Sequence, residues 1–435
     1  MTGPAAADRP ADAAPLWRRS VVGGLAAFAW VAVAALAIGA LEWLAAGRPF
    51  GVRLTWKLAG LYLSAFHGGG VRGVSERLPA DVVGDVTALG PELTLHVTFL
   101  VGTAFAGVVL WRAGRRTGRA AGGGWMRSLA WGASVAPPYA LLMFAATRVT
   151  VLRFPSAGLT EVRPAAVEAL GGALLLGLIA GAAGGAAAAT ETEAPEPCGG
   201  RLRAWVAGGW HMTVALVVLA FAGFLVVAGV RSDVSAAYVR AVGRADAAGA
   251  IAAGHHVLLV ANQSFLIAAP SMGGCVTAEG SGSQPTALCL RTLTVRPGFG
   301  SAVLPGLTSR TVRLSPLWLL FLLVPLGATV WGGHVAAAGV GGRGERALRG
   351  AGGGVVFAVI VLVGEAASAI VIERPPDGDL LRVGADPVGI GALALAWGIC
   401  GGVLGALTPD RRQAPVAGGP PAGDDPEVPP RPTSA

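Results

Sequence analysis

Long apolar stretches recur along the whole chain, and arginine-bearing connections separate them. A helix needs about 20 predominantly apolar residues to cross a bilayer core. Each stretch is predicted to be helical, because a chain in hydrocarbon has to satisfy its own backbone hydrogen bonds. The sequence therefore predicts an all-α fold, a polytopic transmembrane helical bundle. The eight predicted spans are residues 21–44, 93–111, 128–146, 163–188, 205–230, 315–339, 351–372 and 387–407.

A ninth apolar stretch, residues 249–272, is more polar and leaves the span count open. It contains His255, His256, Asn262 and Gln263, and such side chains are costly in hydrocarbon. If this stretch crosses the membrane, the connection 343–349 and the carboxyl tail move outside. If it does not cross, the short basic connections all lie on the cytoplasmic side, as the positive-inside rule requires. We therefore favour eight spans with both termini cytoplasmic, and we treat 249–272 as a candidate re-entrant segment.

The connections divide the chain into two halves of four spans each. Within the first outside connection, residues 54–66 have a weakly amphipathic pattern suited to a helix at the membrane interface. No convincing internal sequence repeat is evident that would support a duplicated transporter. The predicted parts are a disordered cytoplasmic N-terminus (1–20), an N-terminal half (21–188), a cytoplasmic linker (189–204), a C-terminal half (205–407) with an extracytoplasmic or partly re-entrant lobe (231–314), and a disordered tail (408–435).

The composition agrees with a membrane protein. Hydrophobic residues make up 53% of the chain and charged residues only 13%, whereas an ordinary soluble domain carries roughly a quarter charged residues. A soluble fold could not cover its surface with so few charges. The net charge of +8 does not indicate nucleic-acid binding, because the arginines lie between apolar spans and not on one aromatic-studded face. The expected partner is the lipid bilayer, with other envelope or membrane proteins beside it.

Two of the four cysteines, Cys275 and Cys289, share the predicted extracytoplasmic lobe. An oxidising compartment favours a disulfide between them, which would stabilise the lobe by about 3 kcal/mol in the chain-entropy model. The alternative is two free thiols near a membrane face. Cys198 and Cys400 have no predicted role.

Glu365 is the most informative single residue, because an ionised carboxylate within a span is expensive unless it is paired or solvated. It is a candidate functional site, and the alternative is a structural glutamate at a helix contact. Three histidines, His96, His211 and His334, also fall in predicted spans. His96 and Glu365 both lie toward the outer side, so their depth permits a pair that relays protons. Alternatively, each histidine donates a hydrogen bond between helices.

Catalytic and metal-binding motifs are missing from the sequence. There is no HExxH, no paired CxxC, no GxSxG and no Walker loop, and adjacent His255 and His256 would point in different directions on a helix. We therefore predict no catalytic residue, no metal and no cofactor. Glycines at four-residue spacing indicate close helix packing instead. They are Gly177, Gly181 and Gly185 in the fourth span, and Gly398 and Gly402 in the last.

The chain also resembles a group of actinobacterial polytopic membrane proteins of unknown function, the streptophobe-type family. The resemblance lies in residues 61–70 (LYLSAFHGGG), in the 92–116 span that ends in WRAGRR, and in residues 255–275 (HHVLLVANQSFLIAAPSMGGC). It implies an envelope membrane protein and carries over no catalytic or binding residue.

Our leading hypothesis is a non-enzymatic plasma-membrane protein that contacts envelope components or another membrane protein through the lobe 231–314. The first alternative is a transporter or permease that uses Glu365 and a broken segment at 249–272, since interrupted helices often build substrate sites. The second is a membrane-embedded enzyme with His255, His256 or His96 as acid or base.

Overall fold

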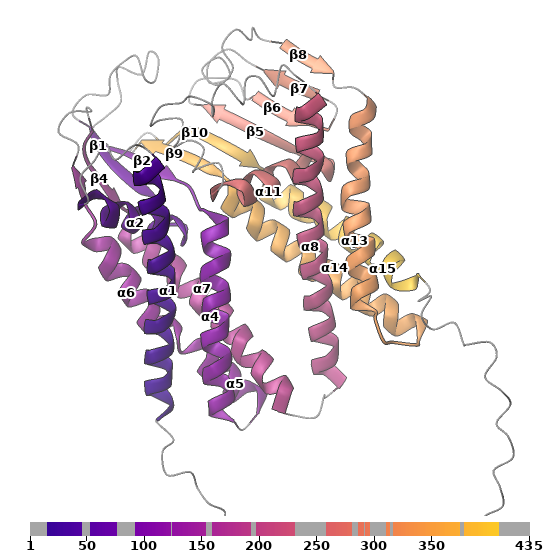
Figure 1. Cartoon of the computed structure of the whole chain (residues 1–435). Helices are drawn as coiled ribbons and strands as arrows, with labels where there is room; N and C mark the ends of the chain where they lie inside the picture. The colour runs from indigo at the N-terminus through magenta and orange to yellow at the C-terminus, as the bar shows by residue number, and fades with distance from the viewer. Residues whose placement is uncertain are drawn as a thin grey trace, which may run out of the picture.

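Long helices stand side by side beneath one β-sheet in the computed structural model (Figure 1). Seven helices in the described part of the chain are long and apolar enough to cross a membrane. The predicted polytopic helical bundle is therefore confirmed. The structure describes residues 15–45, 53–75, 92–122, 124–153, 159–192, 197–230, 258–280, 286–290, 292–295, 310–313, 316–374 and 378–408.

The helices extend beyond the predicted spans, because arginine-bearing turns continue them past the apolar stretches. Residues 16–20 thus belong to the first helix, and the predicted linker 189–204 is largely helical. The long helices are α1 (Leu16–Ala45), α4 (Leu100–Ala121), the pair α5 (Trp125–Ala133) and α6 (Ala136–Arg148), α7 (Ala166–Thr192), α8 (Pro197–Val230), α13 (Leu323–Ala336, after the 3₁₀ helix η1, Pro316–Leu322), α14 (Arg343–Ser368) and α15 (Pro387–Leu407).

Helix α4 completes the bundle although it is not among the seven apolar helices. Its second half carries Arg112, Arg115, Arg116 and Arg119, which lower its hydropathy. It still packs along α7, and the backbones of the two helices are in contact at two glycine positions. The predicted span 93–111 was therefore wrong in its boundaries, because its first residues form a strand and the helix runs on to Ala121.

Two short helices lie at the sheet end of the bundle. Helix α2 (Arg53–Ala65) was predicted to lie at the interface, but its side chains Ala59, Tyr62 and Leu63 are buried in the core of the first half. Helix α11 (Val260–Ser271) lies in the ambiguous ninth stretch. Its 12 residues rise about 18 Å, which is too short to cross a core of about 30 Å. The earlier part of that stretch, with His255 and His256, lies outside the described residues.

All ten described strands form one antiparallel sheet, which the predicted all-α fold did not include. Much of the predicted lobe 231–314 lies outside the described residues, and so do residues 1–14 and 409–435 of the predicted tails. The strand order is β3-β4-β1-β2-β9-β10-β5-β6-β7-β8. The strands are β1 (Val71–Ser75), β2 (Glu92–His96), β3 (Leu152–Arg153), β4 (Leu159–Pro164), β5 (Cys275–Gly280), β6 (Thr286–Cys289), β7 (Thr292–Val295), β8 (Arg310–Arg313), β9 (Ile370–Arg374) and β10 (Gly378–Ala385).

The sheet is amphipathic, as period-two alternation requires when one face packs on a core. Val276 of β5 pairs with Ala385 of β10, and both pack against the apolar core of the second half. The opposite face is charged and exposed. Its exposed charged residues include Arg72, Arg163, Glu279 and Arg382. We call this the outer face of the sheet.

The two halves repeat the same architecture, which the sequence, without a convincing internal repeat, did not indicate. Each half runs as a long helix, a short helix, a strand pair, two antiparallel helical passes, a second strand pair and a final helix. The strand pairings β3–β4, β4–β1 and β1–β2 recur as β9–β10, β10–β5 and β5–β6. Strand β2 then pairs with β9 and joins the halves into one sheet. Four long helical passes in each half give both halves the same direction in the bundle, as in parallel repeats.

Glycine contacts confirm the repeat in detail. Gly181 of α7 packs against Gly132 of α5, and Gly402 of α15 packs in the same way against Gly350 of α14. The corner after each short helix contains a glycine with positive φ, Gly68 in one half (70°) and Gly273 in the other (99°). Only a residue without Cβ adopts this conformation readily. The repeat is thus preserved in backbone contacts and not in side chains, which is why the sequence does not reveal it.

Candidate functional site

Glu365 lies where the sequence placed it, inside a spanning helix. It belongs to α14, its side chain is fully buried, and neither carboxyl oxygen has a hydrogen-bond partner among the residues that the structure describes. The adjacent Gly364 lies against the ring of Phe265 from α11. An acid group without a partner in such surroundings favours a neutral form, since burying a charge costs far more than burying a neutral polar group.

Replacing Glu365 by the neutral isostere Gln is expected to leave thermal stability in detergent unchanged or slightly higher. Glu365→Lys is expected to lose about 3 kcal/mol or more, because it forces an unpaired charge into the core. Glu345→Gln is a control on the same helix, because it removes a carboxylate that is paired. Glu345 lies 2.7 Å from Arg201 and 3.1 Å from Arg349. A marked loss of stability in Glu365→Gln would show instead that the ionised carboxylate is required.

His96 does not lie in a span and does not pair with Glu365, so that predicted pairing was wrong. It is the last residue of β2, because the segment before α4 pairs with β1 and β9 instead of entering the membrane as helix. Its Nδ1 lies 3.4 Å from Glu168 Oε2, and its Nε2 lies 3.3 Å from Glu373 Oε2. Glu168 belongs to the first half and Glu373 to the second, so His96 bridges the halves.

This bridge is part of a charged cluster at the junction of the two halves. Glu168, in the first turn of α7, also accepts a hydrogen bond from Gly70 N (3.0 Å) and pairs with Arg72 (3.2 Å). Gly70 lies opposite His96, and a Cβ at this position would collide with the imidazole ring. We call Arg72, His96, Glu168 and Glu373 the junction cluster. Sequence reasoning missed it because its members come from four different elements.

The other predicted histidines have local structural contacts. His211 Nδ1 lies 2.7 Å from the carbonyl oxygen of Ala207, one turn earlier, and its ring packs edge-on against Trp331. His334 Nδ1 lies 3.3 Å from Thr408 Oγ1 at the end of α15. Neither contact brings a histidine to Glu365.

Asn262 of the predicted re-entrant segment joins the halves. Its amide nitrogen donates to the carbonyl oxygen of Thr98 (2.6 Å), and its Oδ1 accepts from Leu100 N (3.2 Å). It thereby satisfies a backbone N–H group at the start of α4, where helices leave such groups free. Gln263, the next residue, is half-buried on α11. At Asn262, the polar character of this segment is therefore explained by a contact between the two halves.

A buried polar pair in the first half was missed from the sequence. His67 follows α2, with Nε2 2.7 Å from Tyr139 Oη and Nδ1 2.7 Å from the carbonyl oxygen of Leu63. Burial lowers the pKa of the His67 imidazole to about 4. Met272 occupies the corresponding position before the second-half corner. The first half thus contains a buried histidine that the shared fold does not require.

Because the pKa of His67 is depressed in the folded protein, its contribution to stability is present above pH 6.5 and is lost as pH falls toward 4. Between pH 7.5 and pH 5 this group should cost about 2 kcal/mol of stability. Thermal unfolding in detergent should therefore show a pH dependence that His67→Met reduces. An unchanged slope in His67→Met would contradict this assignment.

Cys275 and Cys289 form a disulfide between β5 and β6 and face each other in the register. The pairing is thus the first of the two alternatives left open by the sequence. Cys400 is free and exposed on α15. Among the residues that the structure describes, no group of three or more His, Cys, Asp or Glu side chains is placed to hold a metal ion.

No family model, no curated protein and no solved structure matches this chain. No functional residue is therefore carried over from a relative.

Proposed function

We propose that this protein is a non-enzymatic plasma-membrane protein with the sheet outside the cell and both termini in the cytoplasm. Two features support this orientation. The sheet contains a disulfide, which is typical of an oxidising compartment. The helix ends at the opposite end of the bundle are rich in arginine, which is typical of the cytoplasmic side. These arginines are Arg18, Arg19, Arg112, Arg115, Arg116, Arg119, Arg127, Arg201, Arg203, Arg343, Arg346 and Arg349.

The protein would act through the outer face of the sheet, as a docking surface for the extracytoplasmic part of another envelope protein. The single observation that carries this proposal is the continuous ten-stranded sheet across both halves. Helix connections in bundles usually need only 2–8 residues, so an ordered sheet of this size exceeds what connection requires. Its outer face carries both signs of charge, including Arg72, His96 and Glu373 of the junction cluster. A face with both signs of charge complements the surface of another protein better than it complements a polyanionic polymer.

Site-specific photo-crosslinking in intact cells tests this proposal. A photoreactive side chain at Thr277 or Arg382, on the outer face, should give a discrete adduct with one envelope protein. The matched control is Leu178, an exposed apolar position on α7 that faces lipid in the proposed arrangement. No adduct from the outer face, or the same adducts from Leu178, would contradict the proposed docking surface.

A transporter is the second candidate, and the unpartnered Glu365 favours it. The short helix α11, which contributes Phe265 next to this residue, would then border the pathway. Unchanged flux in Glu365→Gln, reconstituted with a known substrate, would count against a transporter. A membrane-embedded enzyme that uses His96, His255 or His256 stays a third proposal, which tight binding of a metal by the purified protein would favour.

A further inference from the structure

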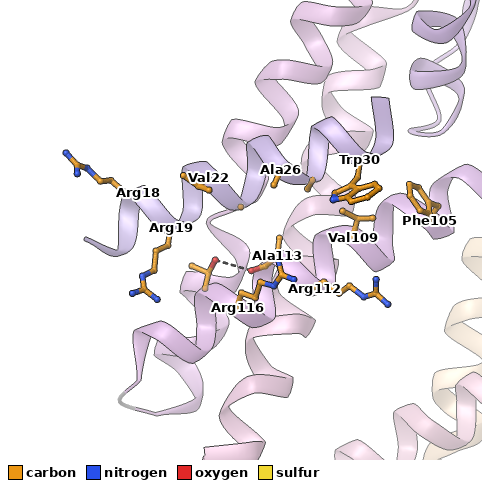
Figure 2. Close-up of a pocket in the computed structure, with 13 residues that line it drawn as sticks. Arg18, Arg19, Val22, Ala26, Trp30, Phe105, Val109, Arg112, Ala113 and Arg116 are labelled. Carbon is orange, nitrogen blue, oxygen red and sulfur yellow. Dashed lines mark hydrogen bonds between the residues drawn. The ribbon is translucent and has the colours of Figure 1, made fainter. Parts of the chain in front are cut away.

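A cavity of about 790 Å³ opens between α1 and α4, at the end of the bundle opposite the sheet. This volume lies within the usual range of ligand sites, about 300–1,000 Å³. Figure 2 shows its two kinds of lining along the two helices. Arg18 and Arg19 come from the start of α1, and Arg112 and Arg116 come from α4; Arg112 lies on the side of Val109 and Phe105. Apolar side chains, with Trp30 and Phe105, line the rest of the cavity.

Arg19 and Arg116 are separated from the aromatic side chains by about the depth of one lipid leaflet. Arg19 and Trp30 are 11 residues apart on α1, and Phe105 and Arg116 are 11 residues apart on α4. At 1.5 Å per residue, each separation is about 16 Å, and half of a bilayer core is about 15 Å. A ligand that fills the cavity would therefore have an anionic end at the membrane surface and an apolar end toward the bilayer midplane.

The four arginines of the cavity are not neutralised by the protein. In the part of the chain that the structure describes, none of them forms an ion pair with an acidic residue. Three arginines at the same end of the second half are used internally. Arg201 and Arg349 pair with Glu345, and Arg346 donates to the carbonyl oxygens of Ala406 and Thr408. The cavity arginines therefore differ from these three, whose charges are used inside the protein.

The repeat shows that the fold does not require these arginines. Gly23 of α1 packs near Ala113 and Thr117, and Gly208 of α8 packs in the same way near Gly332 and Ala336. The residues that precede these contacts differ between the halves. Arg112 and Arg116 in the first half correspond to Trp331 and Val335 in the second. The same helix packing forms in both halves, so the arginines serve a purpose other than packing.

We propose that this cavity binds one anionic phospholipid from the leaflet opposite the sheet. The phosphate contacts the arginines, since guanidinium groups bind phosphate with two parallel hydrogen bonds. An acyl chain lies along the apolar part of the cavity, against Trp30 and Phe105. Basic sites between transmembrane helices bind acidic lipid headgroups in this way.

Lipid binding to the purified full-length protein, followed by native mass spectrometry, tests the proposal. Phosphatidylglycerol should remain bound where phosphatidylcholine does not. The double variant Arg112→Gln/Arg116→Gln should bind phosphatidylglycerol about 30-fold more weakly, from roughly fivefold per arginine. The control Arg203→Gln/Arg343→Gln removes the same charge at the same end, outside the cavity. It should stay within about twofold of the wild type.

A second variant tests the volume of the cavity independently of its charge. Ala26 lines the cavity, so Ala26→Trp should fill it and weaken lipid binding while all four arginines remain. Three results would overturn the proposal: equal retention of phosphatidylcholine, an equal loss in the control pair, or unchanged binding in Ala26→Trp. Displacement of the lipid by an equal concentration of glycerol phosphate would also overturn it, because the site would then take a soluble anion.

Discussion

Gly172→Ala is expected to lose about 3 kcal/mol or more of stability, or to prevent folding, because the added methyl group has no space. A Cβ at this position would overlap the carbonyl oxygen of His67, which belongs to the corner between α2 and β1. Backbone atoms cannot move aside as a flexible side chain can. The corner would have to separate from α7, and with it the start of β1. Thermal unfolding and yield after detergent extraction measure the effect.

The neighbouring residue is a matched control, since it changes the same helix by the same methyl group. Gly171 has nothing within 4 Å of an added Cβ, and alanine is a better helix former than glycine by about 1 kcal/mol. Gly171→Ala should therefore be neutral or slightly stabilising. Equal behaviour of the two variants would contradict the close approach of the corner to α7.

Removing the disulfide is expected to destabilise the sheet by about 3 kcal/mol, as the chain-entropy model predicts for a short closed loop. Cys275 and Cys289 are 14 residues apart in the sequence. Cys275→Ala/Cys289→Ala should expose the β5–β6 region to protease from the sheet side at temperatures where the wild type resists cleavage. The same result should follow from reduction of the wild type.

Cys400→Ala is the control for that experiment, because Cys400 is free and lies on α15. Its protease resistance should match that of the wild type. If the double variant is as resistant as the wild type, β-pairing alone holds the sheet together and the disulfide has no measurable role.

Hydropathy was sufficient to predict the bundle, because about 20 consecutive apolar residues have few alternatives to a membrane helix. It failed at α4, where arginines occupy the second half of the helix and the preceding residues form β2. The sheet was not predicted because its strands are short. Most have only 4–6 residues, and their pairing partners lie in distant connections.

Single residues were predictable where their chemistry is unusual, and pairs were not. Glu365 could be selected from its position in an apolar span, and it is buried as expected. His96 was assigned the wrong partner, because sequence gives depth along a helix but not which elements touch. The repeat was missed for the same reason. It is recorded in glycine contacts such as Gly181 with Gly132 and Gly402 with Gly350, and these can be recognised only in three dimensions.

Cysteine accessibility in intact cells tests most directly whether one sheet covers both halves on the extracytoplasmic side, as proposed. Single cysteines would replace Arg163 and Arg382, on equivalent strands of the two halves, and Arg116 and Arg343, at the opposite end, in a chain without native cysteines. A membrane-impermeant maleimide should label the first pair in intact cells and the second pair only after permeabilisation. Labelling of Arg163→Cys but not Arg382→Cys in intact cells would contradict a single sheet on one side. Labelling of Arg116→Cys and Arg343→Cys in intact cells, with Arg163→Cys and Arg382→Cys labelled only after permeabilisation, would contradict the orientation.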